Sequence, residues 1–121
     1  MIENRRFPRF ALAPMYTSVI AQHVVDAAVR TLDGHAYDIS ENGARLELDE
    51  SVPVGTHLGL CLQLPGEASS IFATGRVIWA MDVEDDPGAR RVAVEFVRFL
   101  HQEDLARLRR YLRSCPLRHA A

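Results

Sequence analysis

Three arginines lie within five positions near the start of the chain, in the stretch RRFPR, where Arg5 and Arg9 enclose Phe7 and Pro8. Proline fixes its own φ angle and biases the preceding residue toward extended backbone. A guanidinium group donates paired hydrogen bonds to phosphate or to the O6/N7 edge of guanine, and it also stacks on flat rings. A stiffened arm of this kind suits a planar, anionic ligand; a solvated basic tail is the simpler alternative.

A second polar cluster lies in the stretch DISENG, residues 38–43. Asp38 and Ser40 alternate with Ile39, so on a strand both polar side chains face the same side. Gly43 permits a backbone conformation, or a close approach of another backbone, that a larger residue resists. Taken alone, the stretch also fits an ordinary strand-to-turn corner in which Asp and Ser side chains bond local amides.

Four further polar residues could reach a ligand held between the two clusters: Arg6, Asn42, Arg45 and Arg76. Arg45 closely follows the second cluster and could reach a phosphate, although a solvated charge on a strand face is the simpler interpretation. The only tryptophan, Trp79, could stack on a base. Because a large aromatic residue on a strand more often packs against its neighbours, we expect packing at Trp79.

The elements that must position these residues are mostly short strands. Apolar residues recur with strand character in GHAYDIS, ARLEL, THLGLCLQLP, IFATGRVIWAM and RRVAVEFVRF. An Asn-Gly pair joins the first two segments and predicts a hairpin. In the third segment the four leucines share one face, so Cys61 lies opposite and is expected to be partly covered. The fourth is long enough to bend at Gly75.

Two other segments are less uniform. Residues 15–32 fit either a strand or a helix, because β-branched and apolar residues continue through the whole stretch. Near the C-terminus, QEDLARLRRYLRS predicts an amphipathic helix with its leucines at helical spacing. Glu103 and Arg107 are four residues apart there and could form an ion pair. We expect the apolar stripe of this helix to cap the strands; a partner-binding helix is the alternative.

Length and composition describe one globular domain. The chain has 121 residues, of which 48% are hydrophobic and 25% charged, which is ordinary for a globular protein. A chain of this size buries roughly two thirds of its unfolded surface. A net charge of −2 argues against a protein that binds duplex nucleic acid, because such proteins are usually basic. Five or six short strands indicate an antiparallel barrel or a sandwich.

Several other classes of protein are disfavoured. Cys61 and Cys115 lie far apart and the five histidines are scattered, so the sequence predicts neither a disulfide framework nor a metal site. Free thiols suit a reducing, cytoplasmic location. No apolar run approaches the ~18 residues of a membrane span, and no secretory signal is recognisable. Because no catalytic motif occurs either, we expect a non-enzymatic protein.

Together, the two polar clusters resemble the motifs of the PilZ domain family. RRFPR is similar to the RxxxR motif, which falls on Arg5 and Arg9. DISENG fits the (D/N)xSxxG motif, which falls on Asp38, Ser40 and Gly43. The order of the motifs agrees with the family. GRVIWA, VAVEFV and the final helix look like its later strands and C-terminal helix, so the resemblance covers nearly the whole chain.

The resemblance implies a mainly β fold, a six-stranded antiparallel β-barrel with a C-terminal α-helix. The barrel and helix would occupy residues 15–121, and residues 1–14 would form a flexible N-terminal arm. It further implies a bacterial receptor for the second messenger cyclic di-GMP, with no cofactor and no metal.

The resemblance also implies roles for the motif residues. Arg5 and Arg9 would bind guanine edges and phosphates, partly by stacking. Asp38 and Ser40 would hydrogen-bond a base or a phosphate, since a carboxylate can accept from the N1–H and N2–H₂ donors of guanine. Gly43 would shape the turn.

A single-domain receptor must pass its signal through a surface. We therefore expect ligand binding to order the N-terminal arm against the barrel and so to change a face that binds a downstream protein. The main alternative is a PilZ-like adaptor that binds proteins but no nucleotide. A barrel for single-stranded nucleic acid is less favoured, because it would need exposed aromatics interleaved with Lys and Arg, and the chain has no lysine.

Overall fold

The computed structural model describes residues 10–11, 18–83 and 86–114. They form seven strands and one helix: β1 Phe10–Ala11, β2 Ser18–Val25, β3 Ala28–Ile39, β4 Gly43–Leu48, β5 His57–Leu62, β6 Ile71–Val83, β7 Asp86–Phe99 and α1 Gln102–Ser114.

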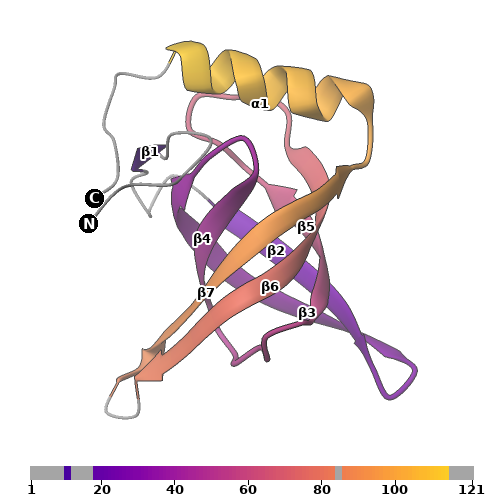
Figure 1. The fold of residues 1–121 in the computed structure, drawn as a ribbon, viewed down its shortest axis with the longest axis vertical. Coiled ribbons are helices and arrows are strands. Elements are labelled where there is room, and N and C mark those ends of the chain that lie inside the picture. Colours follow the sequence, from indigo (N-terminus) through magenta and orange to yellow (C-terminus); the bar gives the residue numbers. More distant parts are fainter. Residues whose placement is uncertain (1–9, 12–17, 84–85, 115–121) are drawn as a thin grey trace.

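Six of the strands close into an antiparallel barrel (Figure 1). The pairing runs β3-β2-β5-β6-β7-β4, and β4 returns to pair with β3, so the sheet closes on itself. The predicted six-stranded barrel with one C-terminal helix is confirmed, and the sandwich alternative is wrong. Away from α1, the hairpins β2–β3 and β6–β7 extend beyond the body of the barrel (Figure 1).

Alternating side chains of the strands fill the barrel interior. The four leucines of the segment at β5 are each at most 3% exposed: Leu58, Leu60, Leu62 and Leu64. Burial of a leucine side chain stabilises a fold by roughly 1.5–3 kcal/mol, so this one stripe is a large part of the core. Cys61, between two of these leucines, is partly covered as expected.

The segment that fitted a strand or a helix forms two strands. β2 and β3 pair directly and turn at Asp26 and Ala27, whose φ angles are 51° and 64°. Both values lie in the left-handed region that tight two-residue hairpin turns require. The predicted hairpin at the Asn-Gly pair is also confirmed, because β3 and β4 are antiparallel neighbours.

α1 covers one end of the barrel (Figure 1), where Leu108 and Leu112 are buried in the core. The capping role predicted for this helix is therefore confirmed. The predicted ion pair of Glu103 with Arg107 is wrong, because Arg107 Nη2 donates to Asp104 Oδ1 at 2.6 Å. Asp104 also accepts from the backbone N–H of Phe72 at 3.2 Å, which fixes the start of the helix to β6.

Some predictions fall outside the described residues. Of the predicted arm, residues 1–14, only Phe10–Ala11 are described. Arg5, Arg6, Arg9 and Cys115 lie outside. Among the residues that are described, no helix has the length and hydrophobicity needed to cross a membrane. The same residues contain no cluster of three or more His, Cys, Asp or Glu that could hold a metal ion.

Candidate ligand-binding site

Asp38 lies beside a β-bulge near the end of β3. Ala36 pairs with Leu46 of β4, and Asp38 pairs with the preceding residue of β4, Arg45. Tyr37 is therefore an extra residue without a cross-strand partner, which is the definition of a bulge. The bulge keeps both Ala36 and Ile39 in the core while Asp38 joins the outward row that contains Arg45.

This outward row crosses four neighbouring strands. It runs from Asp38 on β3 through Arg45 on β4 and Ala93 on β7 to Trp79 on β6. Arg45 Nη1 lies 3.4 Å from Asp38 Oδ2. Because neighbouring strands are about 4.8 Å apart, the row spans roughly 14 Å. In that order the row contains a carboxylate, on a residue that is only 2% exposed, then a guanidinium, a small residue and an indole.

A hollow of about 370 Å³ lies over this row, lined by Tyr37, Arg45, Ile78, Trp79 and Ala93. A smaller hollow of about 40 Å³ shares Ile78 and Ala93 with it and reaches Asn42 and Gly43. The small Ala93 side chain, between larger neighbours in the row, leaves the space open. Together the hollows connect the row to the turn of the DISENG stretch.

Trp79 lines the hollow because of a second bulge. Val77 pairs with Val94 and Trp79 pairs with the adjacent Ala93, so Ile78 is the extra residue. Simple alternation would place Val77 and Trp79 on the same face, but Val77 is buried and Trp79 is 44% exposed. Trp79 is therefore packed only in part, and its indole borders the hollow.

Ser40 and Asn42 organise the turn between β3 and β4. The Ser40 hydroxyl donates to Asn42 Oδ1 at 2.6 Å, and its backbone N–H donates to the Gly43 carbonyl at 2.8 Å. The Asn42 carbonyl accepts from the Phe96 N–H at 2.8 Å. The local turn bonds expected for such a corner are thus present, and direct ligand contacts by Ser40 and Asn42 stay predictions.

Gly43 is required by close packing of two backbones. A Cβ atom at this position would lie 2.3 Å from the carbonyl oxygen of Val94 on β7. Gly43 is not among the residues with positive φ, so of its two predicted roles the structure supports the close approach. Its replacement would push β4 away from β7 at the edge of the site.

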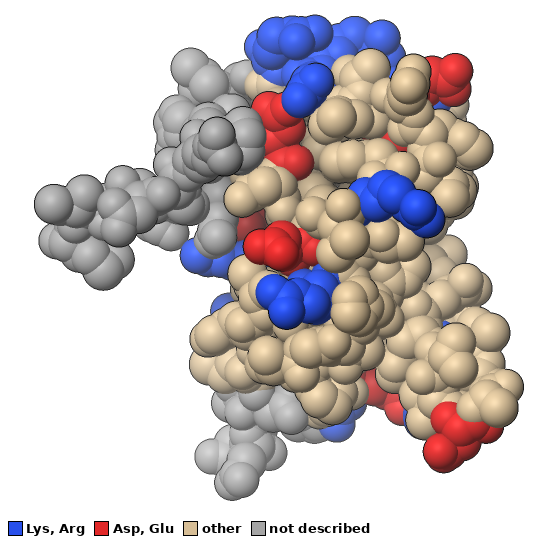
Figure 2. All heavy atoms as spheres, turned by 45° about the vertical axis from the view of Figure 1, so that its right-hand side comes forward, with Lys and Arg blue, Asp and Glu red and all other residues tan. Residues whose placement is uncertain are grey.

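The arginines near the second motif are each paired with a carboxylate. The pairs are Arg45 with Asp38, Arg76 with Glu95 at 3.9 Å, Arg91 with Glu47 at 3.7 Å, and Arg109 with Glu41. Arg45 is therefore an ion-paired residue rather than the solvated charge of the simpler interpretation. Other arginines gather over the end of the barrel that α1 covers (Figure 2).

Sequence reasoning missed Tyr37 and Arg91. The Arg91 guanidinium carbon lies 5.3 Å from the centre of the Tyr37 ring. Burial raises the pKa of Tyr37 above its ordinary value of 10.0, and the Asp38 carboxylate raises this pKa further, whereas Arg45 and Arg91 lower it. Only the register of β3, β4 and β7 brings these groups together, so no local sequence signal identifies them.

We predict that Asp38→Asn lowers the pKa of Tyr37 and that Arg91→Ala raises it. Since the folded protein holds the phenol proton more tightly than the unfolded chain, Tyr37 contributes stability below pH ~10 that is lost as the pH rises through its folded pKa. Phenolate absorbance of each protein, minus that of the same protein carrying Tyr37→Phe, measures this titration. A Tyr37 pKa at or below 10.0 in the unsubstituted protein would contradict the raised pKa from which these predictions follow.

The chain is similar to one known domain family and to several solved structures. The model of the PilZ domain matches residues 3–114. No curated protein is similar in sequence at a significant level. Among solved structures, the PilZ domain with c-di-GMP of YcgR from Escherichia coli has a TM-score of 0.70 and 18% identity, over 93% of this chain and 91% of that one.

Two longer proteins contain a similar fold. The MrkH–c-di-GMP complex of K. pneumonia has a TM-score of 0.67 and 21% identity, over 93% of this chain and 51% of that one. The Bacillus subtilis inhibitor of motility, MotI/DgrA, has a TM-score of 0.63 and 20% identity, over 95% of this chain and 55% of that one. This chain therefore spans about half the length of both.

Proposed function

The chain belongs to the PilZ domain family, and from this membership we propose that it is a receptor for cyclic di-GMP that acts by binding and not by catalysis. Two of the similar structures, the YcgR domain and MrkH, hold c-di-GMP. The ligand is a dianion with two guanine bases. Its site must therefore supply cations, flat surfaces for stacking, and hydrogen-bonding groups.

The observation that carries the proposal is the pairing of β1. Phe10 pairs with Ile39 and Ala11 pairs with Asp38. Arg9 precedes Phe10 in the chain, and consecutive Cα atoms lie about 3.8 Å apart. The RxxxR motif therefore ends one residue before a strand that is paired with the second motif, which supports a shared site.

Charge balance supports a role for the arm arginines. The arginines of the described residues nearest the second motif, Arg45, Arg76, Arg91 and Arg109, already have carboxylate partners. A dianionic ligand needs cations that are not neutralised in this way, because phosphates are bound best by charge-assisted, paired hydrogen bonds. In this proposal Arg5 and Arg9 supply them, with Arg6 as a further contact.

The hollow over Ala93 gives a place for one guanine base. The base would stack against the Trp79 indole, which is worth about 1–3 kcal/mol per base in single-stranded nucleic acid sites. Asp38 would accept from the N1–H and N2–H₂ donors of guanine, and Arg45, which is already paired with Asp38, would be a secondary contact. Ser40 and Gly43 would hold the turn in position. Ser40 would also donate a hydrogen bond to a base or a phosphate.

We expect cyclic di-GMP to bind with saturable heat in calorimetry and to change the fluorescence of the single tryptophan, Trp79. Trp79→Leu should weaken binding by about 5- to 150-fold, because stacking supplies about 1–3 kcal/mol. Ile20→Ala, on the wall formed by β2 and β5, is a matched control that should leave affinity unchanged. No heat with the intact protein would favour the adaptor that binds proteins but no nucleotide.

The proposal includes a route for the signal. Ligand binding would order residues 1–10 against the barrel, and a downstream protein would read the altered surface. Hydrogen exchange over residues 1–10 tests this step, since ordering slows exchange. Equal protection with and without cyclic di-GMP would contradict arm ordering and leave binding itself untouched.

A further inference from the structure

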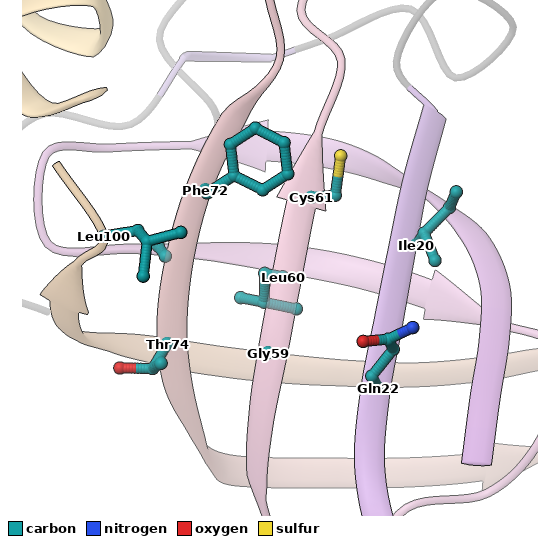
Figure 3. A pocket seen from close by; sticks show the side chains of 9 residues that line it. Ile20, Gln22, Gly59, Leu60, Cys61, Phe72, Thr74 and Leu100 are labelled. Carbon is teal, nitrogen blue, oxygen red and sulfur yellow. The ribbon is translucent and has the colours of Figure 1, made fainter. Parts of the chain in front are cut away.

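A separate hollow, of about 350 Å³, lies on the outer wall of β2, β5 and β6 (Figure 3). An apolar row crosses it from Ile20 through Cys61 to Phe72, which are successive partners in the strand register. Leu100 continues the row, because its N–H donates to the Phe72 carbonyl at 3.0 Å. Ile20, Phe72 and Leu100 are 41%, 41% and 57% exposed.

Gly59 keeps this hollow open. It lies between Gln22 and Thr74 in the next row (Figure 3). A Cβ atom at Gly59 would meet only the Gln22 carbonyl oxygen, at 3.9 Å, and its φ is not positive. Glycine inside a strand is less favourable than alanine, and nothing in the local backbone requires it here. Such a glycine is typical of a place where another molecule approaches closely.

The border of the hollow on β7 is cationic. Arg98 is exposed and pairs in register with Thr74, which lines the hollow. Within the described part of the chain, Arg98 is not a member of any of the ion pairs. Arg98 itself does not line the hollow, and the polar residues that do, Gln22 and Thr74, are neutral. An occupant with a carboxylate beside an apolar group would therefore match this border.

We propose that the hollow binds a segment of a partner protein in which a large apolar side chain stands next to acidic residues. The apolar side chain fills the space over Gly59, between Ile20 and Phe72, and a carboxylate pairs with Arg98. Interfaces concentrate their binding energy in a few buried anchors, and complementary charge at the border selects the partner and speeds association.

This inference extends the proposed function, because a receptor needs a surface for its output. The two can fail separately, since the hollow over Gly59 shares no residue with the hollow over Ala93. Peptide binding without cyclic di-GMP binding would overturn only the receptor, and the reverse result would overturn only this docking surface.

The test uses the full chain, labelled with ¹⁵N, and two synthetic peptides. In the first, leucine and phenylalanine recur every three or four positions among glutamates; in the second, lysine replaces every glutamate. We expect the acidic peptide to shift the amide signals of Gly59, Thr74 and Leu100 and to leave that of Arg45 in place. The basic peptide should bind at least tenfold more weakly.

Two variants make the result specific. Gly59→Leu fills the hollow and should reduce affinity for the acidic peptide at least tenfold, while a circular dichroism spectrum and a cooperative thermal transition like those of wild type confirm that the variant is folded. Arg98→Glu should reverse the preference between the two peptides. Equal binding of both peptides, or acidic-peptide binding that neither variant changes, would overturn the proposal.

The occupant could instead be a second copy of this chain. Sedimentation equilibrium distinguishes this case. We expect the mass of the free protein to be the same in wild type and in Gly59→Leu. A dimer that Gly59→Leu converts to a monomer would also overturn the proposal, because the hollow would then be a self-association surface.

Discussion

Replacing Arg9 by alanine is expected to weaken binding of cyclic di-GMP by about 30-fold or more. Loss of one charge-assisted partner from a bound anion costs about 2–5 kcal/mol, and each 1.4 kcal/mol is about tenfold in affinity. The loss should be large here because the described arginines nearest the second motif already neutralise carboxylates. Calorimetric titration of both proteins measures the difference.

Arg110→Ala is the matched control for Arg9→Ala. It removes the same charge from α1, where Arg110 is exposed and is not a member of the described ion pairs. We expect its affinity to stay within about twofold of wild type, since exposed charges act weakly at physiological salt. If both variants lost affinity equally, Arg9 would act through net charge alone and the proposed contact would be wrong.

The interior of the barrel could be predicted from the sequence because its signal is local. Alternation in the segment at β5 gives the inward leucines directly, and the Asn-Gly pair marks the turn between β3 and β4. The turn of β2 into β3 was not recognisable. Asp26 and Ala27 both adopt positive φ there, although alanine is not a residue that favours such a turn.

The side chains of the outer surface were harder to predict, because each bulge changes which residues after it face outward. One extra residue at Ile78 changes the face on which Trp79 lies, and nothing in the alternation of GRVIWAM indicates where the insertion falls. The alternation along β3 likewise does not indicate that Tyr37 is an extra residue. A bulge is set by strand pairing across the barrel, so a pattern read along a single strand cannot contain it.

The candidate site could be predicted only in part. The two motifs supply Asp38 and the turn around Ser40, and the register then adds Ala93 and Trp79 from strands far along the chain. These additions depend on the order β6-β7-β4-β3 around the barrel, which is a property of the closed sheet. Residues that meet only through this order carry no common sequence signal.

α1 contacts both surfaces considered for binding. Arg109 pairs with Glu41 in the turn of the second motif. Near the start of the same helix, Asp104 accepts from the N–H of Phe72, which belongs to the apolar row of the hollow over Gly59. α1 therefore joins the turn of the second motif to the strand that carries Phe72.

Replacing Gly43 by alanine is expected to destabilise the barrel by about 2–3 kcal/mol, with a Tm lower by roughly 5–15 °C. The new Cβ would lie 2.3 Å from the Val94 carbonyl oxygen. Neither atom can rotate away, because each is attached directly to, or part of, the backbone of a paired strand. β4 must therefore move from β7, which also strains the bond from the Phe96 N–H to the Asn42 carbonyl. Affinity for cyclic di-GMP should fall with stability, because this bond holds the turn of the second motif.

Gly59→Ala gives the matched comparison in the same barrel. Its Cβ would have open space, with the nearest atom at 3.9 Å, so we expect stability to be unchanged or higher by up to about 1 kcal/mol. Thermal and urea unfolding, followed by circular dichroism, measures both variants. Equal stability of the two would show that the contact between β4 and β7 can relax and that closure of the barrel does not depend on Gly43.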